Sequence, residues 1–128
     1  MINDFTLEEK IDIVSDNLTD KTEEEVCEEY GLTEEELREM LNEFYNLPED
    51  SELYYRYQLG INEKKLNKSE TAIRMYRQSL SYVVMHPGTV SDNEVERMKQ
   101  RTSYFEKEAE KQRAKVAELK EEYKKFNN

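Results

Sequence analysis

The sequence predicts an all-α protein, with a tri-helical head followed by a long antiparallel coiled-coil hairpin. The 128 residues include only 3 Gly and 2 Pro, while the helix-favouring residues Glu, Lys and Leu are abundant. Apolar residues recur at helical spacing, first in short runs and then, after Pro48, in an unbroken heptad register. We therefore expect the head over residues 1–46 and the hairpin over residues 47–128.

Each predicted helix of the head begins with the same local signal, a capping box. In this motif a Thr side chain accepts a hydrogen bond from the N3 amide, and a Glu at N3 reaches back to the cap. Gly31 has the position of a left-handed glycine that ends the second helix. The three pairs with the required spacing are Thr6 and Glu9, Thr22 and Glu25, and Thr33 and Glu36.

The segment "TEEEVCEEYGLTEEELREML" (residues 22–41) resembles the helix-turn-helix of transposases, sigma-like factors and the heads of phage terminase small subunits. In those families the helix after the turn reads DNA. The resemblance therefore implies a helix-turn-helix-like head. It also implies a contact surface on that helix, formed by Thr33, Glu34, Glu35, Arg38 and Glu39.

The head is strongly acidic, whereas the rest of the chain is basic. Residues 1–53 hold 19 acidic and 3 basic residues, a net charge of −16, and residues 54–128 hold 11 and 16, a net of +5. Many of the glutamates fall in first turns, where the helix dipole favours them. The acidity thus indicates either helix stabilisation or an acidic contact surface. Under both interpretations the head should bind phosphates poorly.

Within residues 47–128 the sequence predicts two helices, over about 50–85 and 92–127, each roughly 50 Å long. Pro48 suits a first helical turn, and Ser91 with Glu94 fits a fourth capping box. Folding the chain back about the loop 86–91 aligns the two heptad registers, which favours an antiparallel hairpin. The predicted hairpin core consists of Tyr55, Leu59, Leu66, Ile73, Tyr76, Leu80, Val83, Val95, Met98, Phe105, Val116, Leu119 and Tyr123.

A second, mostly apolar row follows the first hairpin helix beside its heptad seam. It includes Tyr54, Ile61, Met75 and Tyr82. Such a doubled stripe needs a second packing partner, and the head is too small to cover its full length. We therefore expect a homo-oligomer with these residues at the interface.

Six basic residues lie among tyrosines in residues 54–78, a pattern that suits nucleic-acid binding. The alternative is that the tyrosines fill packing positions while the basic side chains are solvated. If the chain contacts nucleic acid through this segment, the predicted contacts are Arg56, Lys64, Lys65, Lys68, Arg74 and Arg77.

The sequence contains no catalytic or metal-binding constellation. His86 is the only histidine and lies in a turn, and Cys27 is the only cysteine and follows the apolar Val26. No Gly-rich phosphate loop or paired metal-ligand motif occurs. We expect no enzyme, cofactor or metal. Because neither a signal peptide nor a membrane span is recognisable, we expect a cytoplasmic protein without a membrane partner.

The predicted architecture as a whole resembles the phage terminase small subunit. The resemblance implies a head that recognises packaging-site DNA, paired helices that build a ring, and regulation of a separate packaging motor. The leading hypothesis is therefore a non-catalytic, oligomeric nucleoprotein-assembly protein. The alternative is an acidic protein-interaction module, or a nucleic-acid-mimicking inhibitor or regulator encoded by a phage, that binds a basic surface of a target protein.

Overall fold

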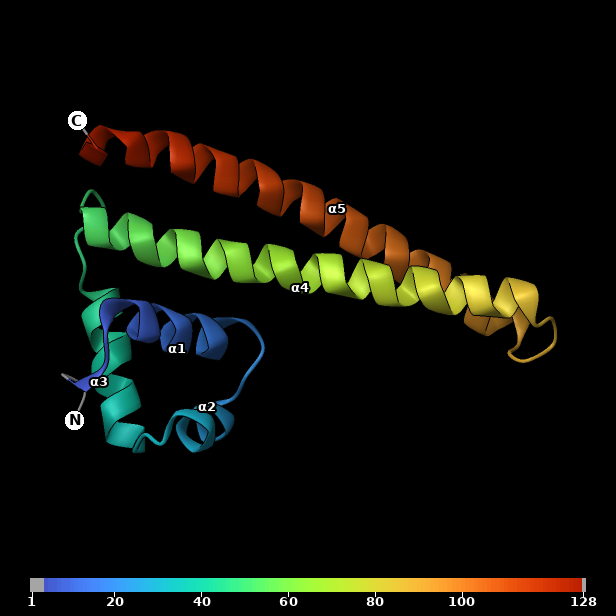
Figure 1. Ribbon diagram of the computed structural model, residues 1–128, viewed down its shortest axis with the longest axis horizontal. Coiled ribbons are helices and arrows are strands. Elements are labelled where there is room, and N and C mark those ends of the chain that lie inside the picture. The colour runs from blue at the N-terminus through green and yellow to red at the C-terminus, as the bar shows by residue number, and fades with distance from the viewer. Residues whose placement is uncertain (1–3, 128) are drawn as a thin grey trace. The chain divides into compact units, whose positions relative to one another are not determined.

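The computed structural model describes residues 4–127 and is all-helical over that range, which confirms the predicted fold class at this level. Its helices are α1 (Leu7–Thr19), α2 (Glu23–Tyr30), α3 (Glu34–Tyr45), α4 (Glu52–Met85) and α5 (Asp92–Tyr123), followed by the short 3-10 helix η2 (Lys124–Asn127) (Figure 1). No described helix is long and apolar enough to cross a membrane.

The chain forms two compact units. The head unit contains the described residues up to Lys64 together with those from Val116 onward, and the loop unit contains Lys65–Lys115. The head unit thus contains α1, α2, α3, the first part of α4, the last part of α5 and η2. The loop unit holds the remaining parts of α4 and α5 and the turn that joins them.

The three predicted capping boxes of the head are confirmed. In α1, α2 and α3 the Thr side chain accepts from the N3 amide, and the N3 glutamate accepts from the amide of the cap residue. Gly31 ends α2 in the left-handed region, with φ 67°, as its position predicts. These local bonds satisfy N-terminal amides that would otherwise lack partners, and so they fix where each helix begins.

The two predicted signals for the ends of the long helices need correction. Pro48 precedes α4 rather than occupying its first turn, and its carbonyl accepts a hydrogen bond from Ser51 Oγ at 2.8 Å. The capping box at Ser91 is half formed, because Ser91 Oγ accepts from the Glu94 amide at 3.2 Å. The Glu94 carboxylate pairs with Arg97 at 3.0 Å instead of returning to the cap.

The core of the head unit extends beyond the predicted boundary at residue 46. Tyr57 and Ile61 of α4 are 3% and 5% exposed and belong to the same buried cluster as the apolar side chains of α1, α2 and α3. Ile61 therefore cannot line an oligomer interface, and that prediction is corrected. The other buried members of the cluster are Ile13, Val14, Val26, Leu32, Leu37, Met40 and Phe44.

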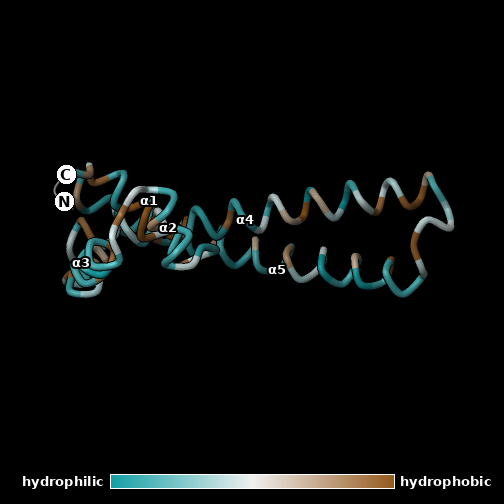
Figure 2. Tube along the Cα trace, turned by 90° about the horizontal axis from the view of Figure 1, so that it is seen from below, coloured by the Kyte–Doolittle hydropathy of each residue, from teal (hydrophilic) through white to brown (hydrophobic). Residues whose placement is uncertain are grey.

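Within each unit, side chains of α4 contact side chains of α5. In the head unit Tyr55 Oη donates to Glu122 at 2.9 Å, and Tyr123 Oη donates to Glu52 at 3.0 Å. In the loop unit the side chains of Ser69, Ile73, Thr102 and Ala109 are buried, and the ring of Tyr76 stacks on that of Phe105. Apolar positions recur along both helices with polar positions between them (Figure 2).

Candidate functional site

The residues of the predicted head contact surface lie together at the start of α3. Thr33 is the N-cap of this helix, and Glu34, Glu35, Arg38 and Glu39 are exposed on its first two turns. Arg38 is paired with Glu34 of the same helix at 3.6 Å. The only base of this surface thus has a carboxylate partner on its own helix.

Carboxylates of α2 converge with those of α3. Burial raises the pKa of the Cys27 thiol, and the nearby charges of Glu34, Glu23 and Glu36 raise it further. Cys27 therefore lies between the first turns of α2 and α3. A thiol with a raised pKa is a poor nucleophile, which agrees with the role of Cys27 as a side chain packed against the core.

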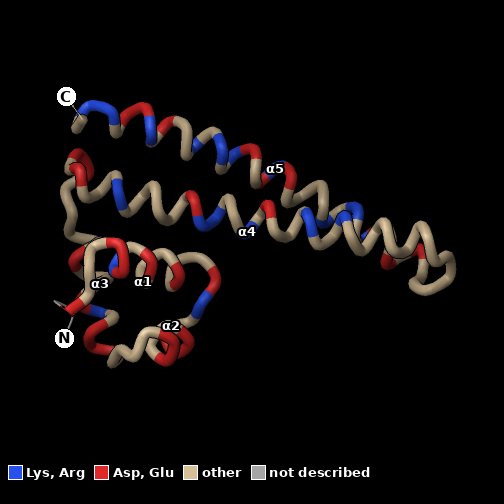
Figure 3. Tube along the Cα trace, in the orientation of Figure 1, with Lys and Arg blue, Asp and Glu red and all other residues tan. Residues whose placement is uncertain are grey.

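We define the acidic surface as the exposed carboxylates of α2 and α3 whose side chains have neither a hydrogen bond nor an ion pair with any described residue. In Figure 3 acidic positions dominate these two helices. Because α2 and α3 are held by their caps and by the core, these groups stand on a rigid support. The surface consists of Glu23, Glu24, Glu28, Glu35 and Glu39.

The basic side chains of the head unit up to Lys64 are all engaged in ion pairs with acids of the same unit. Lys10 pairs with Glu43 at 3.5 Å and Lys21 with Asp16 at 3.6 Å. Arg56 pairs with Glu8, and Lys64 pairs with Asp16. Together with Arg38, these are all five bases of residues 4–64, which also hold 20 acids.

Asp16 is a buried member of these ion pairs. It is 7% exposed and accepts a hydrogen bond from Tyr30 Oη at 2.6 Å, as well as from Lys64. Burial opposes ionisation of Asp16, but the hydrogen bonds from Lys64 and Tyr30 outweigh it, so the pKa of this carboxyl is lowered. Burial, followed by the bond to Asp16, raises the pKa of Tyr30. Asp16 therefore joins α1, α2 and α4 as an anion.

The six predicted nucleic-acid contacts are divided between the two units. Arg56 and Lys64 belong to the head unit and are paired as described above. In the loop unit Arg77 pairs with Glu106 at 3.1 Å. Lys65, Lys68 and Arg74 are exposed and have no ion-pair partner among the described residues.

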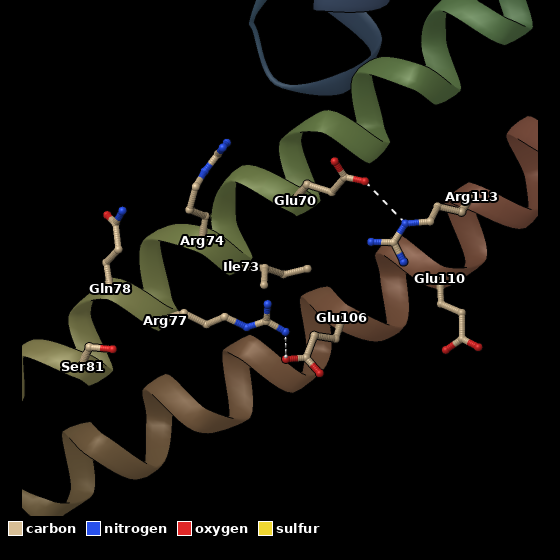
Figure 4. A pocket seen from close by; sticks show the side chains of 9 residues that line it. All are labelled: Glu70, Ile73, Arg74, Arg77, Gln78, Ser81, Glu106, Glu110 and Arg113. Atoms are coloured by element: carbon tan, nitrogen blue, oxygen red, sulfur yellow. Dashed lines mark hydrogen bonds and ion pairs between the residues drawn. The ribbon is translucent and has the colours of Figure 1, made fainter. Parts of the chain in front are cut away.

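An open groove lies between α4 and α5 of the loop unit (Figure 4). Ile73 lies on its floor, and two ion pairs bridge it, Arg77 with Glu106 and Arg113 with Glu70, the latter at 3.5 Å. Arg74 and Gln78 point away from α5 (Figure 4). The other two charged residues of the lining, Arg74 and Glu110, have no ion-pair partner among the described residues.

Among the described residues no cluster of three or more His, Cys, Asp or Glu side chains is arranged to hold a metal ion. His86, which we interpreted as a turn residue, is exposed, and its ring stacks on that of Tyr82 at a centroid distance of 4.1 Å.

The search for similar proteins returned no match among family models, curated proteins or solved structures.

Proposed function

We propose that this chain is a non-catalytic interaction protein whose head binds a basic surface of another protein through the acidic surface on α2 and α3. In this proposal the chain has a tri-helical, helix-turn-helix-like head and an antiparallel coiled-coil hairpin. The head keeps the outline of a DNA reader, but its carboxylates bind lysine and arginine side chains instead of base edges.

The observation that carries the proposal is the imbalance of unpaired charge on the head. All five bases of residues 4–64 are in ion pairs, whereas the five carboxylates of the acidic surface have no partner among the described residues. Duplex DNA is bound mainly through cations that neutralise its phosphates. Because the cations of residues 4–64 are all in ion pairs, this part of the head presents few cations to phosphates, whereas its acidic surface attracts a cationic protein.

The arrangement also favours fast and selective association. A surface of one sign steers an oppositely charged partner during diffusional encounter and repels partners of the same sign. Because the helices are capped and packed before binding, their backbone needs little further ordering. Salt should weaken such binding, since the surface is exposed.

The proposal is tested by fluorescence anisotropy with two labelled probes, a helical peptide rich in Lys and Arg and a short DNA duplex, both at low salt. We expect the peptide to bind and the duplex not to bind. The double variant E35Q/E39Q should weaken peptide binding several-fold. The control E96Q/E118Q removes the same charge from exposed, unpaired positions of α5 and should retain it. Duplex binding, or equal losses in both variants, would overturn the proposal.

A second candidate is the oligomeric assembly role of the terminase small-subunit type. It is favoured by exposed apolar side chains on the loop unit, which include Met75 at 62%, Tyr82 at 56% and Met85 at 77%. In this role the head would contact packaging-site DNA and the chain would regulate a separate motor. A large, uniform oligomer that binds duplex DNA would support this candidate over the first.

A further inference from the structure

One face of α4 in the loop unit is apolar and exposed. Met75, Gln78, Tyr82 and Met85 follow one another at intervals of three and four residues, so they lie on one side of the helix. The three apolar members are 62%, 56% and 77% exposed. We call these four residues, with Lys68 and Arg74, the α4 face. Large apolar side chains gathered in this way on a surface mark an interaction site.

The charge of the α4 face is uniformly positive. Between Lys65 and Met85 the only acid of α4 is Glu70, and this carboxylate is already paired with Arg113 at 3.5 Å. Lys68 and Arg74 have no ion-pair partner among the described residues, and the side chain of Arg74 points away from α5 (Figure 4). The face therefore suits an acidic helix that also carries an apolar side chain.

The chain itself contains a helix with these properties. On α3 the exposed residues Glu35, Glu39, Asn42 and Tyr45 lie opposite the buried Leu37, Met40 and Phe44, which pack into the head core. Tyr45 is 65% exposed, and it is the only large exposed apolar side chain found in the described part of the head unit.

The charges of the two units complement one another on a larger scale. Residues 4–64 have a net charge of −15, from 20 acids and 5 bases, whereas Lys65–Lys115 has a net charge of +4, from 11 bases and 7 acids. Exposed apolar side chains are present on both surfaces: Tyr45 lies on the acidic helix α3, and Met75, Tyr82 and Met85 lie on the basic α4 face. Charge and apolar complementarity thus coincide.

We infer that the α4 face binds helix α3 of a second copy of this chain. The inference rests on the proposed function, because it uses the head as a binding surface, and it names a second copy as one partner. The carboxylates of Glu35 and Glu39 contact Lys68 and Arg74 of the neighbouring chain. Tyr45 packs against Met75 and Tyr82.

Such a contact joins two different surfaces, so one copy still has its α3 surface available and the other still has its α4 face available. Heterologous contacts of this kind build rings or open chains rather than stopping at a symmetric pair. Assembly should increase with protein concentration and decrease with salt. A head bound to a second copy is no longer accessible to other cationic partners, so assembly and partner binding should compete.

The test measures the mass of the full chain by light scattering and by sedimentation over a range of concentrations, at low and at high salt. We expect masses above the monomer at low salt and a shift toward the monomer at high salt. The variants E39K and R74E should each be monomeric. Both positions are exposed, and neither is in an ion pair among the described residues. Circular dichroism should show unchanged helix content in both variants.

Mixing the two variants provides the sharpest comparison. In the mixture the unchanged head of the R74E variant meets the unchanged α4 face of the E39K variant, and the two substituted surfaces restore the charge pair with its signs exchanged. The mixture should therefore assemble although each variant alone does not. The inference is overturned if the chain is monomeric at every concentration. It is also overturned by association that salt strengthens and that neither variant affects, which would indicate apolar pairing of two α4 faces.

Failure of this inference can be distinguished from failure of the proposed function. A monomeric chain that still binds the cationic peptide through Glu35 and Glu39 removes the second copy as a partner and leaves the proposed function intact. A chain that assembles but does not bind the cationic peptide, even when R74E keeps its head unoccupied, removes the proposed function.

Discussion

Gly60 of α4 lies directly against Ile11 of α1, so close that a Cβ added to the glycine would overlap the Cγ2 atom of the isoleucine. Gly60 belongs to a helix, where glycine is otherwise unfavourable by about 1 kcal/mol relative to alanine. The absence of a side chain allows α1 to rest on the α4 backbone. The cost to the helix is therefore offset by contact within the head unit.

We predict that Gly60→Ala destabilises the protein although alanine is the better helix former. Overpacking a close contact costs about 1–3 kcal/mol, which exceeds the gain in helix propensity of about 1 kcal/mol. Urea unfolding followed by circular dichroism measures the difference. The control Ser79→Ala, at an exposed position of α4, should leave stability nearly unchanged. A more stable Gly60→Ala variant would show that Ile11 moves aside without cost.

Asp16→Asn should reduce the free energy of unfolding by about 1–3 kcal/mol, because it removes a charged acceptor from Lys64 and Tyr30 in a buried position. The control is Asp12→Asn on the exposed side of α1, where the carboxylate is 4.0 Å from Lys64. Asp12→Asn should cost much less. Equal effects of the two substitutions would contradict the central position of Asp16.

The same carboxyl should make stability depend on acid pH. The pKa of Asp16 is lowered in the folded state, so its contribution is complete above the unfolded pKa of about 3.9 and is lost as the pH falls through the folded value. We expect the wild type to lose stability below pH of about 4 more steeply than Asp16→Asn. Unfolding curves at a series of acid pH values test this, and parallel curves for the two proteins would contradict it.

Two tyrosines should give the opposite dependence at alkaline pH. Hydrogen bonds to Glu122 and Glu52 raise the pKa of Tyr55 and of Tyr123. Their contribution is therefore present below the unfolded pKa of about 10 and is lost as the pH rises through the folded values. Absorbance titration at the tyrosinate band should show late-titrating phenols, which include Tyr30 and Tyr57 as well as these two. The double variant Y55F/Y123F should show two fewer of them and should lose less stability above pH of about 10.

Thr33→Ala should cost about 1 kcal/mol, because it removes the acceptor for the Glu36 amide at 3.1 Å and opens the capping box of α3. The Thr33 amide hydrogen bond also lowers the pKa of Glu36. Ser103→Ala, at an exposed position of α5, serves as the control and should be close to neutral. Thermal unfolding of the two variants gives the comparison.

Local features of the fold could be predicted from sequence because their causes are local. The signals at Thr6, Thr22 and Thr33 each involve residues three apart, and the structure forms all three capping boxes. The left-handed Gly31 is equally local. The sequence could not show that Glu94 pairs with Arg97 instead of closing the box at Ser91, because that choice depends on competing rotamers of one side chain.

Contacts between distant segments could not be predicted in the same way. Ile61 fits an exposed stripe by its spacing, yet it is buried because α1, α2 and α3 pack against that part of α4. Arg56 and Lys64 have the composition of nucleic-acid contacts, but their partners Glu8 and Asp16 lie far earlier in the chain. Gly60 was the one local signal of this packing, because a glycine inside a helix allows close approach of another element, here the Ile11 side chain of α1.

The sequence shows where the acidic residues of α2 and α3 lie, but it does not show which of them are free to form a contact surface. The run of glutamates after Thr33 is consistent both with helix stabilisation and with a contact surface. The structure assigns Glu36 to the cap and Glu34 to Arg38, and it leaves Glu35 and Glu39 without partners among the described residues. Whether a given glutamate stabilises its helix or belongs to the contact surface depends on the partner of its own side chain.

The most direct test of the account is amide hydrogen exchange measured residue by residue during titration with the cationic helical peptide and, separately, with duplex DNA. The account predicts that the peptide slows exchange or shifts signals at Glu28, Glu35 and Glu39, and that the duplex has no effect on the head. Changes at Lys68 and Arg74 caused by the duplex, with α2 and α3 unaffected by the peptide, would contradict it.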